Sequence, residues 1–166
     1  MTIGQVHDRR AALTYDDLAI RRDIPDFVAF MLATGLRISE AAAVVRGDVD
    51  LARRTVAVRG NVVRVKGMGL VVQADESSKL TIRTLILPEW GVEMLRQRYD
   101  RESCPPSGPV LSAPKGGLRD PSNTARSCSR WARVYCTENP APGCAGRRCP
   151  SPRWTEFPVA GGSPTG

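Results

Sequence analysis

The sequence has almost no histidine and no long apolar run. His7 is the only histidine, and the four cysteines after Arg126 form no Cys-x-x-Cys pair (Cys128, Cys136, Cys144 and Cys149). Protein zinc sites need Cys and His at short spacings and nothing in the sequence indicates an oxidising compartment, so we expect neither a metal site nor disulfides at these cysteines. No stretch approaches the roughly 18 apolar residues of a membrane helix, and the first twenty residues resemble no secretory signal. We therefore expect a cytoplasmic protein without a membrane partner.

The last quarter of the chain lacks the residues that build cores. Residues 127–166 contain no Leu, Ile, Met or Lys, but they hold six Pro, five Gly and four of the five Cys. Such a segment buries too little apolar surface to offset the entropy of ordering it, so we predict a disordered tail over 127–166. A GC-rich gene translated in the wrong frame gives this composition, and a frameshifted tail is one hypothesis for its origin.

Acidic residues are too few to balance the basic ones. The 24 Lys and Arg against 17 Asp and Glu give a net charge of +7 and a pI near 9.6. The tail carries five Arg and two Glu, or +3, which leaves +4 for residues 1–126. This excess favours polyanionic partners over acidic or neutral ones.

Helical patterns occupy the first part of the chain. A capping-box-like start at Thr14 predicts a first helix from Tyr15 to about Arg22. Pro25 suits the first turn of a second helix, and Gly35 is placed to end it. Apolar spacing then predicts a third helix over about Ile38–Val45.

After Asp48 the apolar period changes from helical to two. Thr55–Arg59 and Val62–Lys66 alternate around Gly60 and Asn61, which predicts a β-hairpin with its turn at that dipeptide. Further strands are expected at 70–74 and 82–87, after a turn at 67–69 and a polar connection at 75–81.

Two more helices are expected after the strands. The first opens at Pro88 and Glu89 and runs to about Tyr99, and either Asp120 or Ser122 could cap the second. Helices, a small antiparallel sheet and further helices make an α+β fold.

The octapeptide ATGLRISE (33–40) is the clearest candidate for a functional site. It places Arg37 behind a glycine bend at the start of a helix, where a guanidinium could bind a phosphate through two parallel hydrogen bonds. In the alternative interpretation Arg37 merely pairs with Glu40 at i, i+3 on the surface of the helix. Glu40 is expected to orient Arg37 in either case.

Four segments in this order carry a resemblance to a known family: ATGLRISEAAAVVRGDVDL (33–51), TVAVRGNVVRVKGMGLVVQ (55–73), SSKLTIRTLILPEW (77–90) and GPVLSAPKGGLRDPSN (108–123). Together they resemble the catalytic domain of the tyrosine recombinases, the phage-integrase family. The resemblance covers roughly residues 11–126. It divides the chain into an N-terminal extension (1–10), a partial, truncated integrase catalytic domain (11–126) and the tail (127–166).

The resemblance implies site-specific DNA recombination and DNA integration, with double-stranded DNA and full-length recombinase protomers as partners. In that family a tyrosine attacks a DNA phosphodiester without a metal, a cofactor or a small-molecule substrate, and arginines neutralise the phosphoryl oxygens. By resemblance, Arg37 is the first of two such arginines, Glu40 supports it, and Lys79 is the general acid that protonates the leaving 5′-oxygen.

Other basic residues are candidate phosphate contacts that would position DNA without reading its sequence. Each could instead be an ordinary solvated charge. They are Arg59, Arg64, Lys66, Arg83, Lys115 and Arg119.

The catalytic motifs that end the family's domain have no counterpart here. With His7 as the sole histidine, the sequence contains no His-x-x-Arg. Tyr135 is the only tyrosine after Arg126, and its surroundings resemble no nucleophile segment, so no nucleophile is assigned. We expect a catalytically inactive recombinase fragment. The alternatives are a non-catalytic DNA-binding or interaction module derived from a recombinase, and an unstable remnant.

Overall fold

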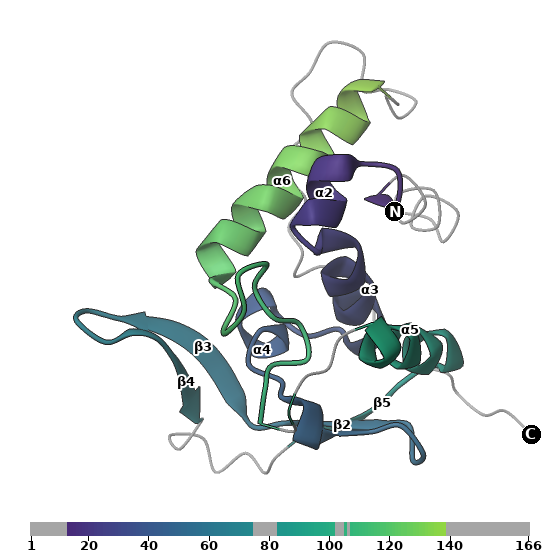
Figure 1. Ribbon diagram of the computed structural model, residues 1–166, viewed down its shortest axis with the longest axis vertical. Helices are drawn as coiled ribbons and strands as arrows, with labels where there is room; N and C mark the ends of the chain where they lie inside the picture. Colours follow the sequence, from purple (N-terminus) through teal and green to yellow (C-terminus); the bar gives the residue numbers. More distant parts are fainter. Residues whose placement is uncertain (1–12, 75–82, 102–104, 106, 139–166) are drawn as a thin grey trace, which may run out of the picture.

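A computed structural model describes residues 13–74, 83–101, 105 and 107–138. In Figure 1 most of the helices lie above the strands. The helical elements, in chain order, are α2 (Asp17–Arg21), α3 (Ile24–Thr34), α4 (Ile38–Ala41), the 3-10 turn η1 (Arg46–Asp48), α5 (Glu89–Arg101) and α6 (Pro121–Glu138). Within the described residues, no helix has the length and apolar character needed to cross a membrane.

The strands form two small antiparallel sheets. They are β1 (Val49–Asp50), β2 (Thr55–Val58), β3 (Gly60–Val65), β4 (Gly69–Ala74) and β5 (Arg83–Ile86). One sheet has the order β1-β2-β5, and the other is the β3-β4 hairpin, which projects away from the helices in Figure 1. The predicted α+β fold with helices before and after a small antiparallel sheet is confirmed.

The β-hairpin predicted around Gly60 and Asn61 is wrong. Both residues lie inside β3, opposite Ala74 and Gln73 of β4, while β2 pairs with β5. A Cβ on Gly60 would lie 2.3 Å from the carbonyl oxygen of Gln73, so glycine is needed for close approach of two strands rather than for a turn. The hairpin turn is at Gly67, where a turn was also expected and where φ is +84°.

Two helix boundaries also differ from the prediction. The carboxylate of Asp16, rather than Thr14, caps α2 by accepting a hydrogen bond from the backbone N–H of Ala19 at 2.9 Å. Helix α4 ends at Ala41 instead of continuing to Val45. The backbone around Val45 is taken up by an antiparallel bridge to Pro109, which prevents further helical pairing.

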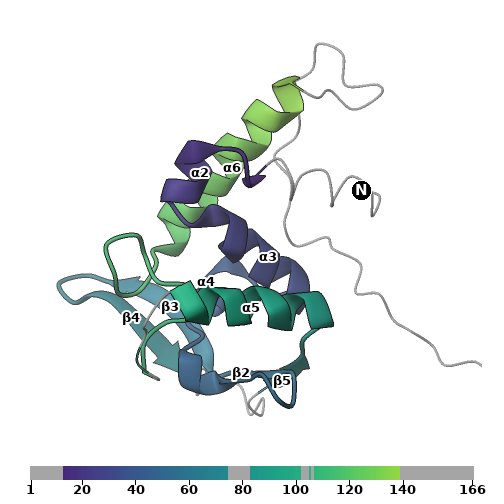
Figure 2. The same cartoon turned by 45° about the vertical axis from the view of Figure 1, so that its right-hand side comes forward.

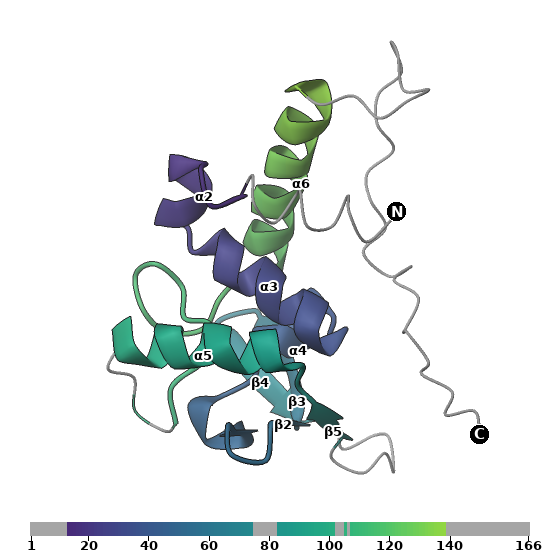
Figure 3. The ribbon, with the colours of Figure 1, turned by 90° about the vertical axis from the view of Figure 1, so that its right-hand side faces the viewer.

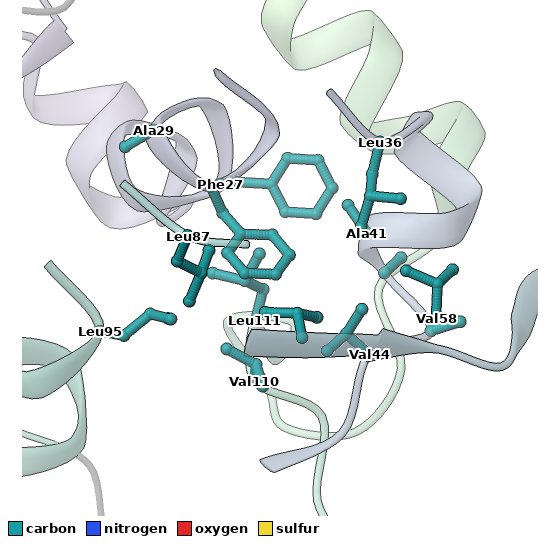
Figure 4. Packing of buried hydrophobic residues seen from close by; sticks show 14 of the residues in the cluster. Phe27, Ala29, Leu36, Ala41, Val44, Val58, Leu87, Leu95, Val110 and Leu111 are labelled. Atoms are coloured by element: carbon teal, nitrogen blue, oxygen red, sulfur yellow. The ribbon is translucent and has the colours of Figure 1, made fainter. Parts of the chain in front are cut away.

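The main core lies between α3, α4, α5 and β2. Figure 4 shows Phe27, Leu87, Leu95 and Leu111 converging, and each of these residues is almost fully buried. In Figure 3, α5 crosses between α3 and the strands. Burial of these large side chains is the main favourable contribution to folding and holds α4 against the sheet.

A second, smaller core joins α2, α3 and α6. Cys128 of α6 is buried against Leu13, Ala19, Ile24 and Val28. Figures 1 and 2 both show α6 alongside α2. Burial raises the pKa of the Cys128 thiol to about 11, so this cysteine is protonated and acts as a small apolar side chain.

This second core corrects the prediction for the beginning of the tail. Residues 127–138 were expected to be disordered, but they continue α6. The N-terminus of α6 is capped by Asp120, one of the two residues expected there, which accepts hydrogen bonds from the N–H groups of Ser122 and Asn123. Residues 139–166 lie outside the described part of the chain.

Candidate nucleic-acid interface

The bend before α4 presents Arg37 on the surface. Gly35 ends α3 in the left-handed conformation with φ of +68°, and its N–H donates to the carbonyl of Met31 at 2.8 Å. Leu36 then enters the core, which leaves Arg37 as the exposed N-cap residue of α4. The predicted glycine bend is confirmed, and it is the local reason why the Arg37 side chain faces solvent.

Glu40 brings two predicted site residues together. Its Oε2 accepts the backbone N–H of Arg37 at 2.8 Å. Its Oε1 forms an ion pair with Nη2 of Arg83 on β5 at 2.6 Å and lies 3.9 Å from Nη1 of Arg37. Two guanidinium groups and one carboxylate give this cluster, Arg37, Glu40 and Arg83, a net charge of +1.

The remaining exposed candidates lie on the strands and on a loop. Arg59, between β2 and β3, forms an ion pair with Asp48, and Arg64 of β3 forms one with Asp120. Lys66 is exposed at the tip of the hairpin and Lys115 is exposed in the loop before α6. Lys79 lies within residues 75–82, outside the described part of the chain.

Arg119 is not available for a phosphate, contrary to the prediction. Only 4% of it is exposed, and its guanidinium donates to the carbonyls of Arg22 and Ser112 at 2.8 and 2.7 Å. It also pairs with Asp23 at 3.1 Å and lies over the ring of Phe27. This arginine therefore fixes the loop before α6 to the start of α3.

Arg98 belongs to the same buried network and was missed by the sequence reasoning. It is 2% exposed, donates to the carbonyl of Val110 at 2.6 Å, and pairs with Asp23 at 2.8 Å and Asp26 at 3.1 Å. A signal was present, because Arg98 follows Leu95 by three residues and so lies on the apolar face of α5.

Burial dominates the electrostatics of Asp23. Desolvation raises the pKa of its carboxyl above the ordinary value, while Arg98 and Arg119 oppose that shift. The ion pairs of this network link α3, α5 and the loop before α6. Arg98 and Arg119 thus bind carboxylates of the protein itself and are not available to DNA.

Solved structures of two recombinases have a similar fold. The integrase of transposon Tn1549 in complex with transposon right end DNA superposes with a TM-score of 0.73 and 18% identity, over 84% of this chain and 46% of that chain. The same integrase in complex with a circular intermediate DNA gives 0.70 and 18%, over 82% and 45%. XerA recombinase gives 0.56 and 18%, over 80% and 41%.

The chain spans less than half the length of these structures. No protein-family model matches the sequence. No curated protein matches it either. The Tn1549 integrase and XerA recombinase are tyrosine recombinases, and the chain has a tyrosine recombinase-like fold.

Proposed function

We propose that this chain binds double-stranded DNA as a partial catalytic domain of a tyrosine recombinase, with DNA integration and recombination as the process from which it derives. The single observation that supports this most is the meeting of Arg37 and Arg83 on Glu40 at the start of α4. The Tn1549 integrase, which has this fold, is in complex with DNA in its solved structures. In this proposal residues 11–126, extended by the rest of α6, form the DNA-binding unit, and the protein acts in the cytoplasm.

Arginine suits this cluster because its planar guanidinium can donate two hydrogen bonds to two oxygens of one phosphate. Arg37 keeps most of its side chain in solvent, so a phosphate can approach without displacing core residues. Glu40 orients Arg37 and Arg83 rather than transferring protons. Arg59, Arg64, Lys66 and Lys115 would add phosphate contacts that strengthen binding without selecting a sequence.

We further propose that the chain does not cleave DNA. Its sequence contains no His-x-x-Arg, and no nucleophilic tyrosine is assigned. Lys79 would still be the candidate general acid. A catalytic set that acts as a unit loses nearly all of its effect when members are missing, so a general acid and one arginine would not sustain turnover.

The test of DNA binding compares single variants of the cluster with a matched control. Arg37→Gln and Arg83→Gln should each weaken binding to a duplex about threefold to tenfold at low salt, as expected for loss of a phosphate contact. Arg96→Gln is the control, because Arg96 is an exposed arginine of α5 paired with Glu93. Equal affinities for the three variants would refute the proposed role of the cluster.

Cleavage is tested separately on a nicked suicide substrate that traps covalent protein–DNA adducts. We expect no adduct with the wild-type chain. An adduct that disappears in Arg37→Gln would overturn the proposal of inactivity and would call for identification of the attacking residue.

A second candidate function is a non-catalytic interaction module that pairs with a full-length recombinase. The observation that favours it is the retention of the packed scaffold in a sequence without His-x-x-Arg. Salt-dependent DNA binding that does not change in Arg37→Gln, together with co-purification with a full-length recombinase, would support this second function over the first.

A further inference from the structure

Asp120 serves two partners at once. Its Oδ1 accepts hydrogen bonds from the backbone N–H groups of Ser122 at 2.8 Å and Asn123 at 3.2 Å, at the N-terminus of α6. Its Oδ2 pairs with the guanidinium of Arg64 on β3. One carboxylate therefore joins the projecting hairpin to the start of the long C-terminal helix.

Asp48 repeats this arrangement at a second place. Its Oδ2 lies 3.5 Å from the backbone N of Val45, just before η1. Its Oδ1 pairs with the guanidinium of Arg59, between β2 and β3. Both carboxylates thus have one oxygen directed at the start of a helical turn and the other at an arginine from the sheets.

In both pairs the arginine lies outside and the carboxylate lies beneath it. The side chains of Arg59 and Arg64 are 57% and 64% exposed, whereas those of Asp48 and Asp120 are 7% and 14% exposed. A phosphate arriving from solvent therefore reaches the guanidinium first. Asp120 remains ionised at neutral pH, because the hydrogen bond from Arg64 is the largest of the effects that lower its pKa.

We infer that Asp48 and Asp120 are internal competitors of DNA for Arg59 and Arg64, so that the free protein keeps these two arginines self-neutralised. This inference rests on the proposed function, since it assumes that the two arginines face DNA phosphates. The surface should then bind a polyanion that presents several phosphates together, and should bind a single phosphate only weakly.

The inference can be tested through the salt dependence of DNA binding, because binding releases counterions from the DNA. Each phosphate neutralised on B-DNA contributes about 0.9 to the slope of log affinity against log salt. When DNA takes an arginine that was paired with a carboxylate, the released carboxylate attracts cations from solution, which offsets part of that release. Removing the carboxylate charge should therefore make the salt slope steeper as well as raise the affinity.

The experiment measures duplex binding by fluorescence anisotropy across a salt series for the wild-type chain, Asp48→Asn and Asp120→Asn. Asparagine caps helices about as well as aspartate, which covers Asp120 at the start of α6. At Asp48, within η1, the amide oxygen of asparagine can still accept the hydrogen bond from the N–H of Val45, so each substitution removes the charge and keeps an acceptor. We expect each variant to bind roughly two- to fivefold more tightly, with a slope that is steeper by up to about 0.9.

Glu93→Gln is the charge-matched control. Glu93 lies on α5 and forms a surface pair with Arg96, so its loss changes the net charge by the same amount away from the proposed interface. Affinities of Asp48→Asn and Asp120→Asn that are equal to or lower than that of Glu93→Gln, with unchanged slopes, would overturn the inference.

A second measurement removes the arginine in two backgrounds. Arg64→Gln should weaken binding more in the Asp120→Asn background than in the wild-type chain, because only there is Arg64 unpaired before DNA arrives. A purely structural role of Asp120 gives the opposite order. If the wild-type chain and Glu93→Gln both fail to bind DNA, the proposed function itself is refuted, which is a different result from binding without any gain.

Discussion

At the scale of single residues, Arg98 is the most deeply buried of the arginines whose ion pairs the structure describes. Its guanidinium is 2% exposed and pairs with both Asp23 and Asp26. Truncating Arg98 would remove a positive charge that pairs with the partly buried carboxylates of Asp23 and Asp26. We predict that Arg98→Ala lowers the free energy of unfolding by about 3–5 kcal/mol, measured by urea denaturation at neutral pH.

Arg101→Ala provides the control for that prediction. Arg101 pairs with the same Asp26, but its side chain is 62% exposed. An exposed pair contributes roughly 0–1 kcal/mol. Similar losses for the two variants would show that burial is not what makes the Arg98 interactions important.

Asp120 should make stability depend on pH in the acid range. Its folded-state pKa is lowered from the ordinary value of 3.8, chiefly by Arg64, so its ionised form stabilises the folded state. That contribution is complete above the unfolded-state pKa and disappears as the pH falls through the folded-state value. We predict that the difference in unfolding free energy between wild type and Asp120→Asn is constant between about pH 7 and about pH 5 and shrinks toward about pH 3.

The check is urea denaturation of both proteins across that pH range. Comparing the two chains removes the contributions of the other carboxyl groups, which are common to both. A difference that stays the same at all pH values would mean that Arg64 and Asp120 are not paired in solution.

Sequence reasoning succeeded for neighbours in the chain and was less reliable for distant ones. The pairing of Arg37 with Glu40 follows from helical spacing, and the structure contains it. The ion pair of Glu40 with Arg83 joins residues 43 positions apart and could not be derived from spacing. Arg119 was assigned to DNA because a sequence does not reveal which arginines are buried.

At the scale of elements, α6 carries the largest departure from the prediction. Its composition suggested disorder after Arg126, but tertiary packing of Cys128 against α2 and α3 outweighs that tendency. The pairing of the strands also could not be derived from the sequence pattern. Alternation correctly located β2 and β3, whereas their partners depended on contacts between β2 and β5 that are distant in sequence.

The contribution of α6 can be measured with two truncated chains. A chain ending at Arg126 loses Cys128 and the rest of the helix, and we predict that its unfolding free energy is lower by at least about 2 kcal/mol than that of a chain ending at Glu138. Urea denaturation of both chains makes the comparison.

Limited proteolysis of the full chain gives an independent check. We predict a stable product that ends near Glu138. A stable product ending near Arg126, with no difference in unfolding free energy between the two truncated chains, would show that the second core does not stabilise the fold.

At the scale of the whole molecule, the two sheets bring basic side chains to the starts of helices. Arg83 reaches α4, Arg64 reaches α6, and Arg59 lies beside η1. Helix α5 is placed differently, since its buried face packs on the core and its Arg98 is used internally. We therefore predict that DNA contacts the side formed by α4 and β3 and leaves α5 uncovered.

The position of the DNA-binding face can be measured by hydrogen–deuterium exchange with and without duplex DNA. We expect slower exchange in peptides covering the bend and α4 (35–41) and β3 with its turn (60–67), and unchanged exchange in α5 (Glu89–Arg101). Protection confined to α5, or no protection at a DNA concentration that saturates binding, would contradict it.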